Sequence, residues 1–312
     1  MAQITAALVK ELREKTGAGM MECKSALTEA NGDVEEGVKV LRKKGLAAAG
    51  KKAGRITSEG LVQAHVDGTR AVLIEVNCET DFVAKTDEFR DMVKQIGQIV
   101  MDSKVETVDE LLKLDWPGDA EGHTVAQVVS QKIAKTGENM SVRRFVRYDG
   151  GPAHHGMGSY VHGNGRIGVL VEVSNDSVDA RVVAGEIARD VAMHVAAAEP
   201  RFVKRDEVTE NDLNTEKEIA RDQAIKSGKP EAVVEKIVAG KMEKYYGEAV
   251  LLEQPYVRDD KTTITQLLKT RGTAAKANFD VVRFTRYKLG EGIEKPQGPD
   301  FATEVMAQAG LK

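Results

Sequence analysis

An internal repeat constrains the fold of this sequence more than any other feature. Residues 162–173, HGNGRIGVLVEV, align without a gap on residues 65–76, HVDGTRAVLIEV. In each copy an Asn-Gly or Asp-Gly pair predicts a type I′ hairpin turn, because these residues accept positive φ, and an apolar strand follows. A second pair of segments, VRRFVRY at 142–148 and VVRFTRY at 281–287, repeats in the same order. We therefore expect an α+β protein with a duplicated core, in which each unit has a small three-stranded antiparallel sheet with helices on one face.

Helices are predicted between the hairpin and the closing strand of each unit. In the first unit Thr86 is an N-cap, and Thr107 and Thr124 each have Glu or Gln three residues later, which is the spacing of a capping box. In the second unit one long helix is expected over residues 180–198. This unit also contains an insertion, residues 204–248, with two helical stretches separated by SGKP. Because Gly ends helices and Pro starts them, the insertion predicts a projecting helical hairpin.

The N-terminal segment predicts three short helices, since apolar residues recur there at helical spacing in three runs. Asp33, with Glu36 three residues later, marks the start of the third helix. The segment KGLAAAGKKAGRITSEG at residues 44–60 has no sustained apolar stripe, so we expect a linker, with a partly helical form left open. The predicted parts are an N-terminal three-helix domain with linker (1–55), a first core unit (56–150), a second core unit (151–299) with the helical hairpin (204–248), and a C-terminal helical module (300–312).

Composition excludes several classes of partner. Charged residues make up 30% of the chain but its net charge is only -4, so no global basic field is present to hold nucleic acid or an anionic membrane. No apolar run reaches the roughly 20 residues of a membrane span, and the first residues lack the order of a signal peptide. The two cysteines, Cys23 and Cys78, are too few for a disulfide framework. We therefore expect a cytoplasmic protein without direct contact to nucleic acid or membrane.

Two phosphate-loop patterns occur in the wrong context. GLAAAGKK at residues 45–52 matches GxxxxGK, but the final residue is not Ser or Thr and a helix precedes the pattern. GNGRIG at residues 163–168 matches GxGxxG, yet it is predicted to be a hairpin turn. His154 and His155 have no further ligand at metal spacing, and His194 lies on the apolar face of its helix, as a core histidine does. We expect no metal site, no cofactor and no enzymatic activity.

The two units differ after the second strand of the hairpin. The second unit leads directly into its helix, whereas the first has a longer loop, NCETDFVAK at residues 77–85, that carries Phe82. Two interpretations stay open: the ring plugs the end of its own sheet, or it is an aromatic residue presented to a partner protein. Met20 and Met21 raise a similar question. Because consecutive residues point about 100° apart on a helix, one of them should face outward if the other faces the core. An outward methionine suits an adaptable partner surface, whereas filling a gap in the core is the commoner use.

Six segments spread along the whole chain resemble one known family. They are LVKELR at 8–13, TGAGMMECK at 16–24, EVNCETDFVA at 75–84, AMHVAA at 192–197, SGKP at 227–230 and GEGIEK at 290–295. The resemblance is to the bacterial elongation factor Ts family, which acts in translation. It implies an N-terminal domain similar to the ubiquitin-associated fold, a duplicated core, a coiled-coil protrusion and a C-terminal helical module.

The resemblance implies a guanine nucleotide exchange factor without covalent catalysis. Such a protein binds the GTPase elongation factor Tu in its GDP form, dislodges magnesium and promotes GDP release, so that GTP can bind. By the same resemblance, the residues Thr80, Asp81, Phe82 and Val83 form the family's signature loop, which wedges between two helices of the GTPase domain. The positions that touch this domain from the other side are Arg13, Met20 and Met21, and His162 contributes to a contact of the second unit with another domain of the GTPase.

Other assignments stay open beside this one. The helical hairpin is a candidate contact for a homodimer. The arginines of residues 143–147 and the basic linker suggest an RNA-binding module, against which the near-neutral charge and the scarcity of aromatic residues argue. A phosphate-binding enzyme that uses residues 45–52 is the third assignment. It would require turnover of a nucleotide by this protein alone.

Overall fold

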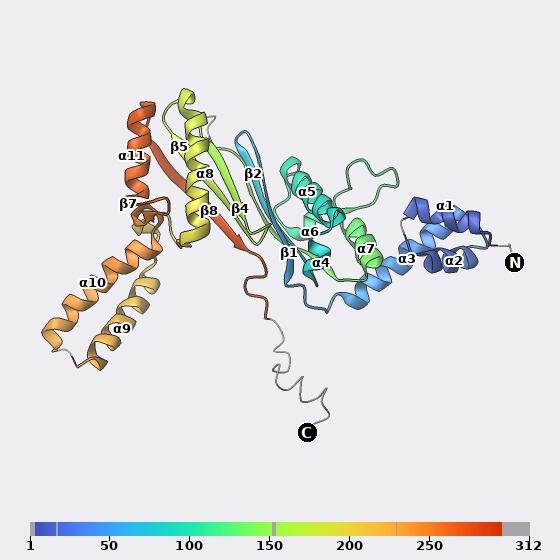
Figure 1. Ribbon diagram of the computed structural model, residues 1–312, viewed down its shortest axis with the longest axis horizontal. Coiled ribbons are helices and arrows are strands. Elements are labelled where there is room, and N and C mark those ends of the chain that lie inside the picture. Colours follow the sequence, from blue (N-terminus) through green and yellow to red (C-terminus); the bar gives the residue numbers. More distant parts are fainter. Residues whose placement is uncertain (1–3, 17, 152–153, 229, 295–312) are drawn as a thin grey trace, which may run out of the picture.

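The computed structural model describes residues 4–16, 18–151, 154–228 and 230–294 of the 312-residue chain. The predicted C-terminal helix over residues 300–309 lies outside these ranges. Helices and small antiparallel sheets make up an elongated α+β molecule, in which two sheets occupy the centre and helical segments extend to both ends (Figure 1). No helix within the described ranges is both long and apolar enough to cross a membrane.

The three N-terminal helices enclose a small apolar cluster around Leu12, Cys23 and Leu27. The third helix corrects the predicted linker, because it continues to Lys52 instead of ending near residue 44. Small residues in its second half allow it to pack on helix α7 of the first core unit, where Lys52 Nζ lies 3.4 Å from the Ile133 carbonyl oxygen. The helices are α1 (Ala6–Thr16), α2 (Met20–Glu29) and α3 (Val34–Lys52).

The first unit contains a sheet of antiparallel order β1-β2-β3 with helices packed on one face. The expected caps are present: Thr86 accepts a hydrogen bond from the Phe89 N–H, and Thr107 and Thr124 both begin capping boxes. The elements are β1 (Glu59–Asp67), β2 (Arg70–Cys78), α4 (Asp81–Ala84), α5 (Asp87–Asp102), α6 (Val108–Leu111), α7 (Val125–Thr136) and β3 (Met140–Tyr148).

The second unit repeats this plan with the order β4-β5-β8. Helix α8 approaches strand β4 closely, because a Cβ atom at Gly156 or Gly158 would lie 2.3 Å from the helix backbone. The elements are β4 (Gly156–His162), β5 (Ile167–Asn175), η1 (Val178–Ala180), α8 (Arg181–Ala198), η2 (Arg205–Glu207), α9 (Glu210–Lys226), α10 (Glu231–Ala249), η3 (Leu251–Glu253), β6 (Pro255–Tyr256), β7 (Asp259–Thr263), α11 (Ile264–Ala275) and β8 (Phe279–Lys288).

The two hairpin turns differ from each other, and neither is the predicted type I′ turn. In the first, Asp67 pairs with Arg70, and within this turn only Gly68 has positive φ, which fits a type II′ turn. In the second, His162 pairs with Ile167, so the loop has four residues, and three successive ones, at positions 163–165, have positive φ. The prediction was wrong because the pairing register, which the dipeptide alone does not reveal, decides which residues form the turn.

The sheets of the two units pack face to face. Side chains that include Val62, Leu73 and Leu170 fill the space between them, while helices cover the two outer faces (Figure 1). The Val62 N–H donates to the Gly165 carbonyl oxygen at 2.8 Å, so the turn of the second unit rests on β1 of the first. The core therefore has four layers, helices, sheet, sheet, helices, with an approximate twofold relation between the units.

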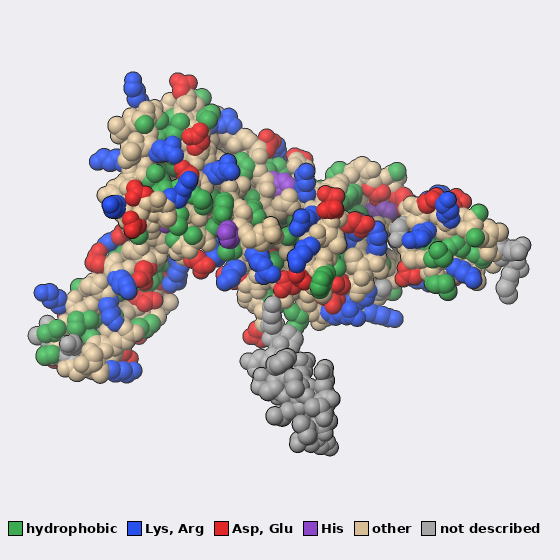
Figure 2. Space-filling view, in the orientation of Figure 1, with side chains coloured by type: hydrophobic (Ala, Val, Ile, Leu, Met, Phe, Trp, Pro, Cys, Tyr) green, Lys and Arg blue, Asp and Glu red, His purple; other side chains and the backbone are tan. Residues whose placement is uncertain are grey.

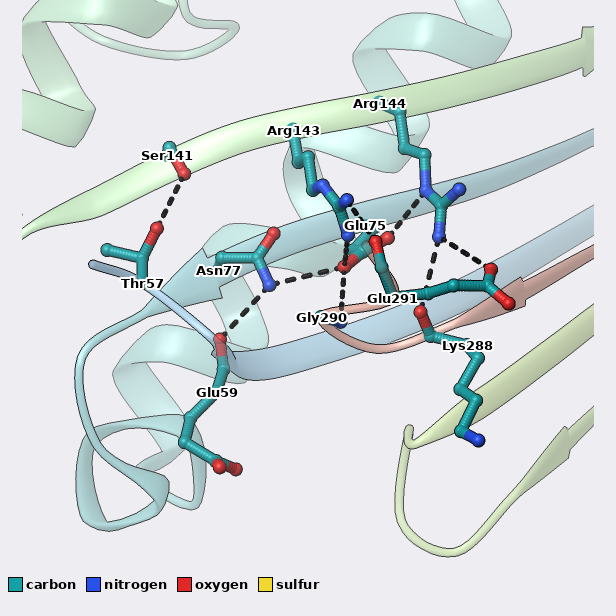
Figure 3. A network of polar contacts seen from close by, with 10 residues as sticks. All are labelled: Thr57, Glu59, Glu75, Asn77, Ser141, Arg143, Arg144, Lys288, Gly290 and Glu291. Atoms are coloured by element: carbon teal, nitrogen blue, oxygen red, sulfur yellow. Dashed lines mark hydrogen bonds and ion pairs between the residues drawn. The ribbon is translucent and has the colours of Figure 1, made fainter. Parts of the chain in front are cut away.

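Each unit has a buried glutamate on its central strand, opposite a β-bulge of the closing strand β3 or β8. Glu75 accepts hydrogen bonds from Arg143, Arg144, Asn77 and the Gly290 N–H, at 2.6–3.2 Å (Figure 3). Because a bulge sets two residues of one strand opposite one residue of its partner, both arginines can reach the same carboxylate. Gly290 follows strand β8, so this carboxylate of the first unit holds the end of the second.

The helical hairpin α9–α10 has its own apolar core of Ala220, Ala224, Val234, Val238 and Met242. It projects from the second unit (Figure 1), as predicted from its charged sequence. Gly228 has a φ of +72° beyond the end of α9. Pro230 is the N-cap of α10 and not its first residue, a shift of one position from the prediction.

Candidate functional site

Phe82 is the most exposed large apolar side chain of the described residues, with 79% of its surface accessible. It lies on α4, a single helical turn that the sequence predicted only as a loop. The neighbouring Val83 and Ala84 pack against the core of the first unit and Phe82 points away from it. The ring therefore does not plug its own sheet, which leaves the presented aromatic as the interpretation to pursue. An isolated ring with this exposure costs hydration free energy that a partner surface would recover.

The turn that carries Phe82 is fixed by hydrogen bonds at its start. Thr80 is the N-cap of α4 and accepts from the Val83 N–H. Its own N–H and hydroxyl donate to the two carboxylate oxygens of Glu138, at 3.0 and 2.8 Å. The buried Cys78 thiol donates to the Thr80 carbonyl oxygen at 3.1 Å, and burial raises the pKa of this thiol to about 12. At neutral pH the thiol keeps its proton and remains a donor.

An ion pair lies beside the ring. Lys85 Nζ lies 2.5 Å from Asp81 Oδ2 and 6.0 Å from the centre of the Phe82 ring. The hydrogen bond from Lys85 holds the pKa of Asp81 below its ordinary value, and Arg166 adds to this effect. Arg166 Nη2 itself lies 3.6 Å from Glu59 Oε2 on β1, and β1 also contacts α4, so the β4–β5 turn and the Phe82 turn both lie at the surface beside β1.

His162 lies beside this surface, at the end of β4. Its side chain is exposed, and its Nδ1 lies 3.0 Å from the Tyr160 hydroxyl, with the two rings stacked 5.9 Å apart. The structure brings the β4–β5 turn next to the first unit, so the predicted contributions of Phe82 and His162 come from neighbouring parts of the core. The role of His162 in binding remains a prediction.

The three N-terminal site residues lie away from Phe82, on helices α1 and α2 at the far end of the molecule (Figure 1). Arg13 is exposed, and Met20 and Met21 are 60% and 74% exposed. Neither methionine faces the core, because α2 packs through Cys23 and Leu27, one and two turns further along the helix. Both methionines are therefore available to a partner, and their flexible side chains suit an adaptable contact.

The two phosphate-loop patterns lie in elements that cannot cradle a phosphate. Residues 45–52 belong to the continuous helix α3, whose N–H groups bond within the helix. Residues 163–168 form the β4–β5 turn and the start of β5. His194 is a satisfied core residue, as predicted: Nε2 lies 2.8 Å from Gln254 Oε1, Nδ1 accepts from the Val257 N–H, and burial lowers its pKa.

Glu138 is the residue of this site that the sequence interpretation missed. It follows the C-terminal glycine of α7, and only the tertiary fold brings it to Thr80, 58 positions earlier. The sequence contains the segment GEN at residues 137–139, but no spacing rule connects this segment to the Phe82 turn.

Comparison with known proteins gives a consistent result. The family model described as Elongation factor TS matches residues 79–291. The protein named elongation factor Ts from Trichlorobacter lovleyi is 47% identical over 99% of this chain and 99% of its own length. The corresponding protein of Syntrophotalea carbinolica is 48% identical over 97% of this chain and 98% of its own, and that of Clostridium perfringens is 47% identical over 98% and 99%.

Proposed function

The chain belongs to the elongation factor Ts family, and we propose that it is a guanine nucleotide exchange factor for the GTPase elongation factor Tu in translation. The observation that carries this proposal is the exposed Phe82 on a turn fixed by Thr80 and Glu138. A rigid aromatic side chain that is exposed in the free protein is typical of an interface hot spot. Because the turn is held before binding, little conformational entropy is lost when a partner docks.

In the proposed mechanism Phe82 enters the GTPase domain beside its nucleotide site and displaces the magnesium ion. The ion neutralises charge on the β-phosphate, so its loss weakens GDP binding. Arg13, Met20 and Met21 contact the same domain from the N-terminal helices, and the β4–β5 turn with His162 contacts another domain. No bond is made or broken, so we propose that the protein is not an enzyme.

The exchange is driven by reciprocal binding. If this protein weakens the binding of GDP to the GTPase, then GDP weakens the binding of this protein by the same factor. The same reciprocity holds separately for GTP and this protein. Abundant GTP can therefore displace the exchange factor and complete the cycle. A complex with both ligands bound provides the route of lower barrier for nucleotide loss.

The charge distribution supports a protein partner over RNA. Lys and Arg side chains alternate with Asp and Glu over the visible face (Figure 2), and the net charge is -4. Nucleic-acid binding draws on a continuous basic surface, which this face does not present. We propose a cytoplasmic protein, with the projecting hairpin α9–α10 as the candidate contact for a homodimer.

Release of labelled GDP from elongation factor Tu tests the proposal directly. Addition of this protein should accelerate release in the presence of magnesium. Chelation of magnesium with EDTA should mimic much of this acceleration, and the protein should then add little more. If the release rate is the same with and without this protein at saturating concentration, the proposed function is wrong.

A further inference from the structure

The Phe82 turn is held by two hydrogen-bonded pairs that run in opposite directions. Glu138 accepts from the N–H and hydroxyl of Thr80, at 3.0 and 2.8 Å. In return the Asn139 N–H donates to Glu79 Oε1 at 2.6 Å. Residues 79–80, after β2, and residues 138–139, before β3, thus exchange a carboxylate and an N–H with each other. Hydrogen bonds to a carboxylate are stronger and shorter than those between neutral groups, so this contact restricts the turn from both sides.

The second unit contains one half of the same arrangement. The strand registers align Glu79 with Asp176 and Asn139 with Asn278, and the Asn278 N–H donates to Asp176 Oδ1 at 2.9 Å. The left-handed helix end is also repeated, at Gly137 in α7 and Lys276 in α11. We call the two reciprocal contacts a clamp. Its first half, the hydrogen bond from the Asn139 or Asn278 N–H to the carboxylate of Glu79 or Asp176, occurs in both units and is therefore independent of Phe82.

The other half exists in the first unit alone. The position of Glu138 is occupied by Ala277 in the second unit, and Ser177 stands where the first unit has Thr80. Alanine has no side-chain acceptor, so Ser177 cannot be held in the same way. The first unit, which presents Phe82, is thus the unit that has Glu138. The second unit adopts the same fold with Ala277 in this position.

We propose that Glu138 is a positioning residue for nucleotide exchange, which acts through Thr80 to hold Phe82 in the orientation that enters the partner. This inference rests on the proposed function and adds a residue to it. Glu138 does not itself contact the partner. Its carboxylate fixes Thr80, the N-cap of α4, and the single helical turn then sets the direction of the ring. Without the carboxylate, the ring samples other directions and fewer encounters lead to insertion.

The first test compares Glu138→Ala with Asp176→Ala, the matched change in the second unit. Glu138→Ala should slow GDP release at saturating factor by about fivefold or more, because hydrogen bonds to a charged group are lost. Asp176→Ala should leave release within about twofold, since its clamp holds no partner-binding residue. Glu138→Gln, which retains one acceptor oxygen, should lie between Glu138→Ala and the original protein.

The second test asks whether Glu138 acts through Phe82. In a protein that already contains Phe82→Ala, adding Glu138→Ala should slow release no further, because the ring that it orients is absent. A purely structural role would instead give the same additional slowing in both backgrounds. Thr80→Val, which removes the hydroxyl that donates to Glu138, should resemble Glu138→Ala.

A third measurement does not depend on the exchange assay. Amide hydrogen exchange in the free protein should show protection of the Thr80 N–H that is lost in Glu138→Ala, with an unchanged melting temperature as evidence of folding. Loss of protection with an unchanged release rate would overturn the positioning role and leave the proposed function intact. If the original protein does not accelerate GDP release from elongation factor Tu, although its Thr80 N–H is protected from exchange, the proposed function would be overturned instead.

Discussion

The two core units have the same strand order, the same bulge beside a buried glutamate and the same left-handed helix end, yet they present different surfaces. The first ends its hairpin in a fixed turn with Phe82 exposed. In the second unit the short helix η1 runs straight into α8, and Val178 is exposed at the adjoining position. The comparison indicates that the features shared by both units maintain the fold, and we propose that the features found in one unit serve partner binding.

The buried glutamates of the two units also differ, in the number of hydrogen-bond donors that surround them. Glu75 accepts from four donors, whereas Glu172 is bound by Arg283 and His155, each at 2.7 Å. The arginines opposite the two carboxylates also cross between the units: Arg144 stacks on Tyr287 and Arg283 on Tyr148. The two sheets therefore contact each other through equivalent Arg–Tyr pairs. Glu75 has additional donors, among them the Gly290 N–H after the end of β8.

The largest expected effect is on stability, from replacing Glu75. Glu75→Gln should lower the free energy of unfolding by about 3 kcal/mol, since breaking a buried ion pair leaves charged partners unpaired. Glu172→Gln, with fewer donors, should cost about 1 to 2 kcal/mol. Urea unfolding of both variants measures the difference. Equal losses would show that the additional donors around Glu75 contribute nothing.

The stabilisation by Glu75 should also depend on pH. Burial acts to raise its pKa, but the hydrogen bonds from Gly290, Arg143 and Arg144 prevail and hold the pKa below its ordinary value. A depressed pKa in the folded state stabilises the protein above the unfolded pKa of about 4.3, and this stabilisation is lost as pH falls through the lower folded pKa. Unfolding measured from pH 7 to pH 3 should show this step in the original protein and a smaller one in Glu75→Gln.

The next effect is on exchange, from replacing Phe82. Phe82→Ala should slow GDP release by about tenfold or more, because truncation of a hot-spot residue costs about 2 kcal/mol or more. Its melting temperature should change little, since the ring is 79% exposed. The matched control is Val178→Ala in the second unit, which should leave release unchanged. Equal slowing by both variants would contradict the claim that the exposed residue of the first unit serves exchange and that of the second does not.

A weaker effect is expected at Asp81. Asp81→Ala should slow GDP release by a few-fold, less than Phe82→Ala, because a carboxylate that stays partly hydrated contributes less than a desolvated ring. The control is Asp179→Ala, an exposed carboxylate in the corresponding segment of the second unit. Release rates at low and high salt add a check, since the contribution of Asp81 should decrease as salt screens it.

The smallest effect is expected outside both units, in the helix that contains the GxxxxGK pattern. Lys51→Ala should leave GDP release within a few-fold, because Lys51 is an exposed residue of α3. Equilibrium dialysis of this protein with labelled ATP or GTP measures the alternative directly. Nucleotide binding that Lys51→Ala abolishes would contradict the assignment of this segment as a structural helix.

Local sequence patterns predicted much of the fold correctly. The repeat gave the two three-stranded sheets, and the caps at Thr86, Thr107 and Thr124 gave the helix starts, because each depends on residues within three positions of each other. The turn types and the end of α3 were wrong. Both depend on contacts with distant segments: the register of each hairpin, and the packing of α3 on α7.

For the candidate site, the sequence by itself determined that one of the two units has an aromatic residue in a longer loop, and that the chain resembles a known family. It did not determine whether Phe82 is buried or exposed, because both outcomes fit an apolar residue near the end of a strand. The tertiary structure decided this, because Val83 and Ala84 pack on the core while Glu138 holds Thr80 across 58 positions of sequence. Hydrogen bonds between such distant residues form only when β3 pairs with β2, so local patterns do not reveal them.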